Sequence, residues 1–352
     1  MKVLKALMYF SRVVTLSIDI STEGSSVLVA SDREFESYLE TAFNTRRSNF
    51  GNTLYCYSPT SYQYQIDDHH INNSRNFLSL SVTGLACSLN CDHCQKKLLN
   101  GMIPTLSPDE LIKRCIEVKK YNGEGVLISG GADSQGSVPL DRFGDAIRFV
   151  KTQLGLKVVV HTGILKESSV SMLADVGVDA VMLDVIANPD VSHRVYHLTD
   201  GPKRIRESLR LLDEYKVPSV PHVLIGLDYG KINGELDALT MISEFYPAGI
   251  VIIILNPVRG TPMANVTPPS PSVTGRILTI ARLGFPKTPL LLGCARPIGH
   301  HKVKSDRYAI RAGVNGIAYI SQEGVDFARE VGLKPNFKDI CCSLSYQTIS
   351  SD

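Results

Sequence analysis

Short apolar runs rich in β-branched residues alternate with longer amphipathic stretches from Phe77 almost to the end of the chain. The stretches between the runs, such as residues 107–121 and 201–216, carry apolar residues at helical spacing. Eight strand–helix units predict an α/β fold, a (β/α)8 TIM-type barrel. An open doubly wound sheet is the alternative, because one miscounted strand would change the architecture. The runs expected as strands are residues 77–85, 125–131, 157–163, 180–185, 219–227, 249–258, 289–297 and 316–321.

The chain outside this alternation is expected to form two appendages. Residues 1–75 are rich in Ser, Tyr, Asn and Thr and lack the strand–helix rhythm, so they are interpreted as an N-terminal extension. Residues 76–332 would form the barrel, and residues 333–352 a C-terminal tail over the barrel mouth. The chain begins with a basic and then apolar segment, but Arg12 and Asp19 interrupt it and no cleavage site follows. That start is therefore expected to be a strand or helix of the fold.

Composition narrows the class of protein. The 352 residues are 43% hydrophobic, enough to bury a large core. The 37 basic and 35 acidic residues nearly cancel and form no basic patch with aromatics, which argues against a nucleic-acid partner. No run approaches the roughly 18 apolar residues of a membrane span. We therefore expect a cytoplasmic protein, in which the eight cysteines serve as ligands or core residues rather than disulfides.

Three of those cysteines, Cys87, Cys91 and Cys94, follow the first predicted strand. Strand ends form the catalytic face of a barrel, and thiolates at this spacing suit zinc or an iron-sulfur cluster. A structural zinc site usually closes with a second pair of ligands, whereas His93 lies between two of the cysteines. Three ligands favour an open 4Fe-4S cluster with one iron free to bind another molecule. Three unrelated thiols are the alternative.

The CxxxCxxC motif at this position resembles that of the radical S-adenosylmethionine (SAM) superfamily. The resemblance implies that Cys87, Cys91 and Cys94 hold a 4Fe-4S cluster whose free iron chelates SAM. Reductive cleavage of SAM there yields a 5′-deoxyadenosyl radical that takes hydrogen from carbon. The residue before the third cysteine is commonly aromatic in the superfamily, and here it is His93, which can also stack on adenine.

Other segments support the same resemblance. Gly130 and Gly131 resemble the glycine pair beside the methionine amino group of SAM, since residues without Cβ let the backbone approach a ligand; an ordinary turn is the alternative. Ile225 resembles an adenine-contacting residue, with a core position as the alternative. The resemblance covers about residues 40–342, and the segments similar to biotin synthase and its relatives are 46–59, 183–196 and 255–263.

The remaining cysteines bear on the type of radical enzyme. Cys294 lies near the end of the seventh predicted strand, and Cys341 and Cys342 are adjacent in the tail. A tail folded over the mouth would bring the three together as ligands of an auxiliary cluster, which in this superfamily can be a sacrificial sulfur donor. Incidental thiols are the alternative, since adjacent cysteines are unusual cluster ligands. Cys115 is interpreted as a core residue, and Cys56 as either a fourth ligand or a buried thiol.

This distribution argues against biotin synthesis, since biotin synthase binds its second cluster with cysteines of the barrel strands and an arginine. The GCARPIG segment, residues 293–299, and the tail pair resemble the archaeal two-component lipoyl synthases. That resemblance implies sulfur insertion at C6 or C8 of a protein-bound octanoyl-lysine. It also implies a second radical SAM subunit, an octanoylated lipoyl carrier domain and an external electron donor as partners.

Two other functions remain open. A radical SAM enzyme acting on a small molecule would need the first cluster alone, and a zinc-binding scaffold would need no catalysis. Polar residues at other predicted strand ends, Asp184, His161, His222 and Asn256, could line a catalytic pocket. Each could equally be a hydrogen-bonded barrel residue.

Overall fold

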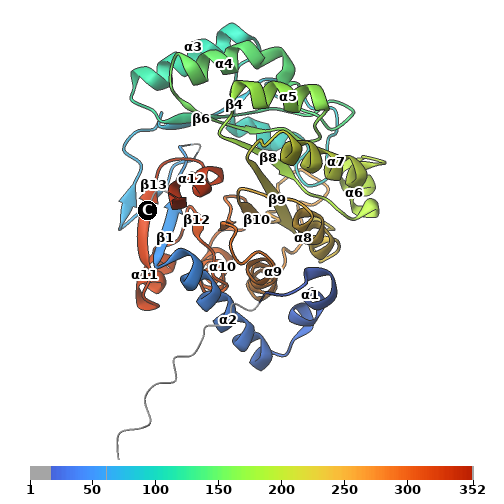
Figure 1. Cartoon of the computed structure of the whole chain (residues 1–352), viewed down its shortest axis with the longest axis vertical. Coiled ribbons are helices and arrows are strands. Elements are labelled where there is room, and N and C mark those ends of the chain that lie inside the picture. The colour runs from blue at the N-terminus through green and yellow to red at the C-terminus, as the bar shows by residue number, and fades with distance from the viewer. Residues whose placement is uncertain (1–16, 61, 351–352) are drawn as a thin grey trace, which may run out of the picture.

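A parallel sheet of eleven strands curls, with helices on its outer face (Figure 1). The inner side of the curl, which is filled by a hydrophobic cluster, is called the lumen here. The computed structural model describes residues 17–60 and 62–350, so most of the expected strand or helix at the chain start lies outside the described residues. No helix within those two ranges is both long and apolar enough to cross a membrane.

All eight expected strands form, and they lie side by side in chain order, which confirms the strand–helix alternation of a TIM-type barrel. These strands are β4 (Phe77–Ser81), β6 (Gly125–Ser129), β7 (Lys157–His161), β8 (Ala180–Asp184), β9 (Ser219–Ile225), β10 (Ile250–Ile254), β11 (Leu290–Leu292) and β12 (Gly316–Ala318). The further strands are β1 (Thr53–Tyr57), β5 (Ile103–Pro104), β13 (Lys334–Lys338) and a separate pair, β2 (Gln65–Ile66) and β3 (His69–His70).

The curl is not closed by strand pairing. β12 pairs with β1 instead of β4, and β13 continues the sheet beyond β1. The segments expected to be an extension and a tail therefore each contribute a parallel strand to the main sheet. Side chains bridge the remaining gap: Thr60 Oγ1 accepts from the Phe77 amide (3.0 Å), and Asn76 Nδ2 donates to the Asp339 carbonyl (2.9 Å).

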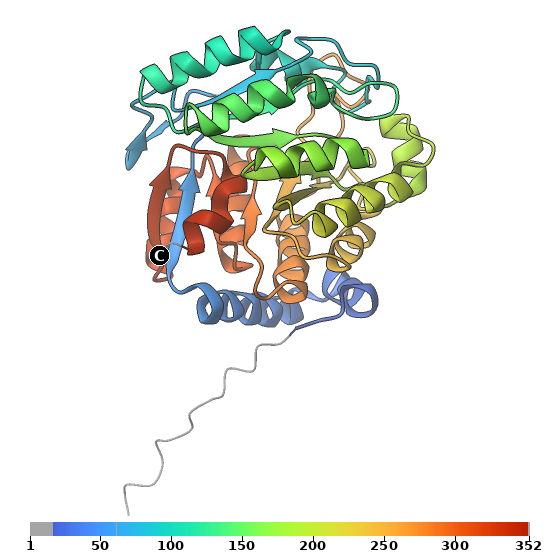
Figure 2. The same ribbon diagram turned by 45° about the horizontal axis from the view of Figure 1, so that its top comes forward.

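The end of the chain enters the lumen, whereas we expected it to cover the mouth. Cys341 and Cys342 are 9% and 7% exposed and pack with inward-facing residues of the sheet such as Met182. The short helix that follows, α12 (Ser345–Ser350), lies at the N-terminal ends of β7 and β8, where the Tyr346 hydroxyl donates to the Asp179 carbonyl. Figure 2 shows this red segment inside the curl. An apolar inner face has to be filled, and the tail fills part of it.

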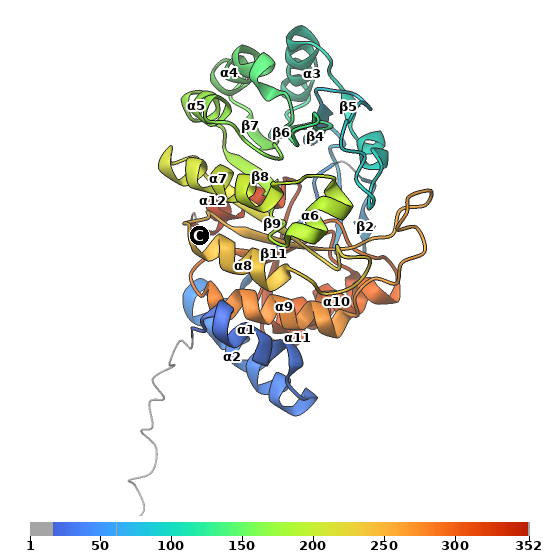
Figure 3. The same ribbon diagram turned by 90° about the vertical axis from the view of Figure 1, so that its right-hand side faces the viewer.

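The helices cover the outer face of the sheet, and the two N-terminal helices pack on α8, α9 and α10 (Figure 3). Ser31 begins the second of them with a capping box: its side chain accepts from the Glu34 amide, and Glu34 accepts from the Ser31 amide (2.9 Å). The α-helices are α1 (Ile20–Val29), α2 (Asp32–Phe50), α3 (Pro108–Lys120), α4 (Gly144–Thr152), α5 (Glu167–Val176), α6 (Pro189–Tyr196), α7 (Gly201–Glu214), α8 (Glu235–Ser243), α9 (Pro271–Gly284), α10 (His300–Arg311) and α11 (Gln322–Glu330), and the 3-10 turns are η1 (Lys97–Gly101), η2 (Leu140–Phe143) and η3 (Cys342–Leu344).

Side chains of each strand alternate between the helix layer and the lumen. In β7, Val158 and Val160 pack toward the helices, whereas Val159 packs in the lumen cluster. Both faces are apolar, as expected for parallel strands that are covered on both sides. The period of two then places His161 and Asp184, the last residues of β7 and β8, on the lumen side.

The Asp339 side chain should stabilise this edge of the sheet measurably. Its Oδ1 accepts from the Ser58 hydroxyl (2.6 Å) and lies 2.8 Å from His69 Nε2, and Ser58 is fully buried. Asp339→Ala removes the closest acceptor of that hydroxyl and leaves only His69 Nε2 at 3.3 Å, so the free energy of unfolding, measured in urea, should fall by about 1–3 kcal/mol. Asp326→Ala removes an exposed carboxylate 3.7 Å from Arg329 and should cost less than about 0.5 kcal/mol. Equal losses would contradict a special role for Asp339.

Candidate active site

The loop after β4 carries Cys87, Cys91 and Cys94 at the C-terminal edge of the sheet. The Cys94 amide donates to the Cys91 carbonyl (3.1 Å), so the second and third cysteines form one turn. Three non-glycine residues of this loop adopt left-handed backbone conformations, which cost energy and persist where the surroundings enforce them. These residues are Asn90, Gln95 and Lys96.

The chemistry of the three thiols suits an iron-sulfur cluster. The hydrogen bond between Cys91 and Cys94 raises the pKa of Cys91 and lowers that of Cys94, which favours a thiolate at Cys94. Within residues 17–60 and 62–350, no three His, Cys, Asp or Glu side chains converge as ligands of a single metal ion. A 4Fe-4S cluster does not require the three thiols to converge on one ion, because each cysteine ligates its own iron.

The glycine pair after β6 lies directly against this loop. A Cβ at Gly131 would be 2.0 Å from the Ala86 carbonyl oxygen and 2.4 Å from Cys87 Cβ. The Gly131 amide also donates to Thr83 Oγ1 (2.7 Å), and a Cβ at Gly130 would lie 2.9 Å from the same hydroxyl oxygen. The close approach of two backbones therefore requires Gly131, whereas the close neighbour of Gly130 is the Thr83 side chain. Contact with SAM at this pair stays a prediction.

His93 faces α6 on the other side of the loop. Its ring centroid lies 5.1 Å from that of Tyr196, with 31° between the planes. His93 Nδ1 is buried and has no hydrogen-bond partner among the described residues. An unpartnered buried ring nitrogen beside the cysteines is consistent with a site that accepts a ligand. Stacking of His93 on adenine stays a prediction.

A polar cluster of Asp184, His161, His222 and Tyr196 lies inside the lumen, below the cysteine loop. Asp184 Oδ2 accepts from the Tyr196 hydroxyl (3.0 Å), and Asp184 Oδ1 lies 3.5 Å from His161 Nε2. The rings of His161 and His222 are 5.6 Å apart and nearly perpendicular. The structure thus brings together three residues predicted from separate strand ends, and it adds Tyr196. The sequence had no signal for Tyr196, because an aromatic residue on a helix usually indicates core packing.

Opposing effects set the charge of this cluster. Burial raises the pKa of Asp184, but the hydrogen bond and charge of His161 outweigh it and hold that pKa well below its usual range. Burial lowers the pKa of His161, but Asp184 outweighs it and the net shift is upward. Burial and the charge of His161 lower the pKa of His222 to about 4. A His161–Asp184 ion pair beside a neutral His222 follows near pH 6.

The thiols of Cys341 and Cys342 in the tail also lie in the lumen. Ser343 Oγ donates to Cys341 Sγ (3.0 Å), and the hydrogen bond from Cys342 lowers the pKa of Cys341 to about 7. Burial, followed by the charge of Cys341, raises the pKa of Cys294. Cys341 also interacts electrostatically with His161. Cys341 and Cys342 are therefore buried beside the polar cluster, whereas Cys294 is an exposed residue that interacts with Cys341 through its charge.

Arg296 holds the loop that carries Cys294. Its guanidinium donates to the carbonyls of Gly293 and Ala318 (both 2.6 Å) and to Asp306 Oδ1 (2.9 Å). These partners belong to the walls of the curl, so the arginine of the GCARPIG segment has a structural role.

Several predicted residues lie elsewhere. Ile225 has no exposed surface and packs between the sheet and the helices, which agrees with the core alternative. Cys56 faces the helix layer between two lumen-facing tyrosines of β1, so it is not placed to be a fourth ligand. Cys115 is buried in α3, as expected for a core residue, and Asn256 is exposed after β10.

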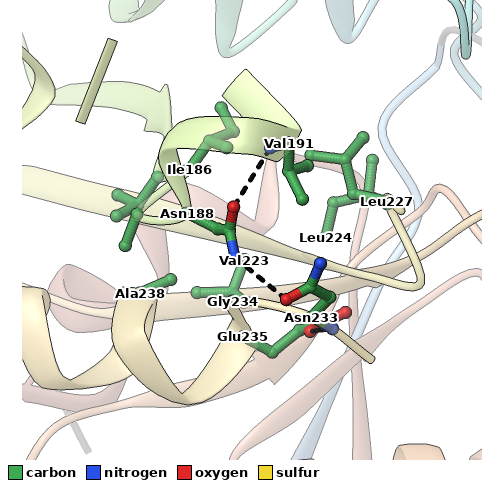
Figure 4. Close-up of a pocket in the computed structure, with 12 residues that line it drawn as sticks. Ile186, Asn188, Val191, Val223, Leu224, Leu227, Asn233, Gly234, Glu235 and Ala238 are labelled. Atoms are coloured by element: carbon green, nitrogen blue, oxygen red, sulfur yellow. Dashed lines mark hydrogen bonds between the residues drawn. The ribbon is translucent and has the colours of Figure 1, made fainter. Parts of the chain in front are cut away.

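A small pocket lies between the ends of β8 and β9 (Figure 4). Its volume of ≈ 20 Å³ is enough for about one water molecule. Polar groups of Asn188, Asn233 and Glu235 border it together with apolar side chains. A cofactor or substrate needs far more space than this pocket offers.

Comparison with known proteins relates part of the chain to one superfamily. Residues 81–234 match the family model described as the Radical SAM superfamily, and this range contains the three loop cysteines and the glycine pair. This segment is similar to radical SAM proteins. The chain is 25% identical over 307 residues to a biotin synthase of Saccharopolyspora erythraea, covering 86% of this chain and 80% of that one. A biotin synthase of Thermodesulfovibrio yellowstonii is 23% identical over 222 residues, which are 60% of this chain and 67% of that one.

Solved structures agree on the fold. Methylornithine synthase superposes with a TM-score of 0.64 at 16% identity and covers 95% of this chain and 97% of that one. The FeFe-hydrogenase maturase HydG from Carboxydothermus hydrogenoformans superposes with a TM-score of 0.62 at 14% identity and covers 96% of this chain and 82% of that one. The match to the Radical SAM superfamily model implies a 4Fe-4S cluster and SAM, and the assignment of Cys87, Cys91 and Cys94 as the cluster ligands stays a prediction.

The His161–Asp184 pair gives a prediction on pH. Asp184→Asn removes the carboxylate that raises the pKa of His161, so burial should dominate and that pKa should fall below the wild-type value. NMR titration of the histidine ring signals measures the shift. In the wild-type protein the pair should stabilise the fold most between about pH 4 and about pH 6.5, since the Asp184 contribution is lost at lower pH and the His161 contribution at higher pH.

The matched control is Asp175→Asn, which removes an exposed carboxylate paired with Arg148 (2.5 Å) and should leave the His161 titration unchanged. An unaltered His161 pKa in Asp184→Asn would show that the two side chains do not interact.

Proposed function

We propose that this chain is a radical SAM protein that inserts sulfur into a protein-bound octanoyl-lysine at C6 or C8, as one component of a two-subunit lipoyl synthase. The observation that carries the proposal is the position of Cys341 and Cys342 in the same lumen as the polar cluster below the cysteine loop, with Cys294 close enough to interact electrostatically with both. The buried tail fills part of the inner face, and its two adjacent thiols also place soft ligands there. Ligation of an auxiliary iron-sulfur cluster, the source of sulfur, is the function that soft ligands at this place support best.

The proposal assigns separate roles to different residues of the chain. When bound, the 4Fe-4S cluster and SAM supply a carbon radical that removes a hydrogen atom from the substrate. Gly130 and Gly131 keep the second strand close to the cysteine loop, and His93 with Tyr196 forms a wall beside it. The lumen, filled at one end by α12, excludes water from the reacting carbon.

The proposal also needs partners. An octanoyl chain on a carrier domain would enter from the C-terminal face of the sheet, because α12 occupies the other end of the lumen. A second radical SAM subunit would supply the other sulfur, since one sacrificial cluster is spent in each insertion. An external electron donor would reduce the cluster.

A second function is favoured by one observation. The ion pair of His161 and Asp184, together with His222, makes the lumen polar where an octanoyl chain would pass. Such groups suit a small polar substrate, as in a radical SAM enzyme that acts without sulfur insertion. That enzyme would bind about four irons after anaerobic reconstitution, and the sulfur-inserting enzyme about eight.

Mass spectrometry of an octanoylated carrier peptide tests the proposal. The chain alone, with SAM and a reductant, should give at most a singly thiolated peptide, and the dithiolane should appear after the partner subunit is added. The double variant Cys341→Ala/Cys342→Ala should still form 5′-deoxyadenosine but transfer no sulfur, because only the auxiliary ligands are lost. Cys115→Ala, which removes a buried helix thiol, should retain sulfur transfer.

Two results would contradict the proposal. Complete lipoyl formation by this chain alone would rule out the two-component form. Sulfur transfer and iron content unchanged in the double variant would show that the tail thiols are incidental.

A further inference from the structure

The loop between β9 and α8, residues 226–234, is held in one shape by a buried carboxylate. Glu235 is 4% exposed and accepts from the amides of Gly226 (2.7 Å) and Asn233 (2.6 Å), which lie at the two ends of the loop. Gly230 has φ +86°, and a Cβ there would lie 2.4 Å from the Thr267 carbonyl oxygen. The loop is therefore a rigid element.

Side chains tie this loop to α6 as well. Asn188, the N-cap of α6, donates from Nδ2 to Asn233 Oδ1 (2.9 Å), as Figure 4 shows. Asn233 Nδ2 donates to Asp228 Oδ2 (2.8 Å), and Arg194 donates to the other oxygen of Asp228 (2.5 Å). Asp228 is 6% exposed, so both of its partners act on a buried carboxylate. The loop and α6 form one connected unit.

That unit holds the cysteine loop by hydrogen bonds at Asp92, which lies between Cys91 and His93. The Tyr229 hydroxyl donates to Asp92 Oδ2 (2.5 Å), and His197 Nε2 lies 3.3 Å from Asp92 Oδ1. The Asp92 amide also donates to the carbonyl of Val195 in α6 (3.0 Å). Backbone and side chain of Asp92 are thus both held from outside the cysteine loop.

We propose that the β9–α8 loop is a positioning clamp for the cluster-binding loop, acting through the hydrogen bond from Tyr229 to Asp92. The cysteine loop needs such a clamp, because Asn90, Gln95 and Lys96 hold left-handed conformations that the loop would relax without external contacts. Tyr229 has a left-handed backbone conformation too (φ +48°), which the loop around it enforces. Tyr229 is a positioning residue and touches neither cluster nor substrate in this proposal.

Hydrogen exchange of the chain without cluster or substrate tests the clamp independently of sulfur insertion. Tyr229→Phe keeps the ring and removes the hydroxyl, so amides of residues 88–96 should exchange about tenfold faster, with the rest of the sheet unchanged. The matched control is Tyr215→Phe, whose hydroxyl also donates to a carboxylate, Glu167 (2.9 Å), but on the outer surface. It should leave exchange in residues 88–96 at the wild-type rate.

A second variant and a spectroscopic measurement complete the test. Asp92→Asn retains an acceptor oxygen for Tyr229 and should raise exchange less than Tyr229→Phe does. After reconstitution, Tyr229→Phe should bind the wild-type amount of iron but give a broader electron paramagnetic resonance signal from the reduced cluster, because the ligand loop samples more conformations. Wild-type exchange in Tyr229→Phe, or faster exchange spread evenly over the whole sheet, would overturn the clamp.

Discussion

The requirement to bury both faces of a curled parallel sheet governs the rest of this structure. Each strand presents alternate side chains to the helices and to the lumen, so the inner face must be filled as closely as the outer one. Valine and methionine fill part of it, and residues 341–344 with α12 fill more. The same alternation places the polar ends of β7 and β8 inside, where burial makes their charges strongly interdependent.

The open edge of the curl explains how the tail reaches the lumen. A barrel closed by β4 and β12 would leave no passage, whereas here β1 and β13 extend one edge and the Asn76 side chain at the other edge donates to the Asp339 carbonyl. The chain crosses this gap directly after β13 and carries Cys341 and Cys342 inward. One topological feature therefore links the shape of the sheet, the position of the tail thiols and the proposed second cluster.

The sequence predicted the parts of the fold that have a strong local pattern. The eight apolar runs, the cysteine loop and the glycine pair were evident, because each depends on residue types at short spacing. β1 and β13 were missed: Lys334–Lys338 is polar and only partly buried, so no periodicity distinguishes it from a loop. The path of the tail depends on pairing between distant segments, which local patterns do not encode. The same is true of Tyr196 and Asp92, whose roles arise from contacts with other elements.

Formation of 5′-deoxyadenosine tests the central claim most directly, namely that the loop after β4 binds the cluster that cleaves SAM. Wild-type protein reconstituted without oxygen should form this product from SAM and a reductant, as should the control Cys115→Ala. The triple variant Cys87→Ala/Cys91→Ala/Cys94→Ala should form none. Product from the triple variant at the wild-type level would contradict the assignment of the cysteine loop.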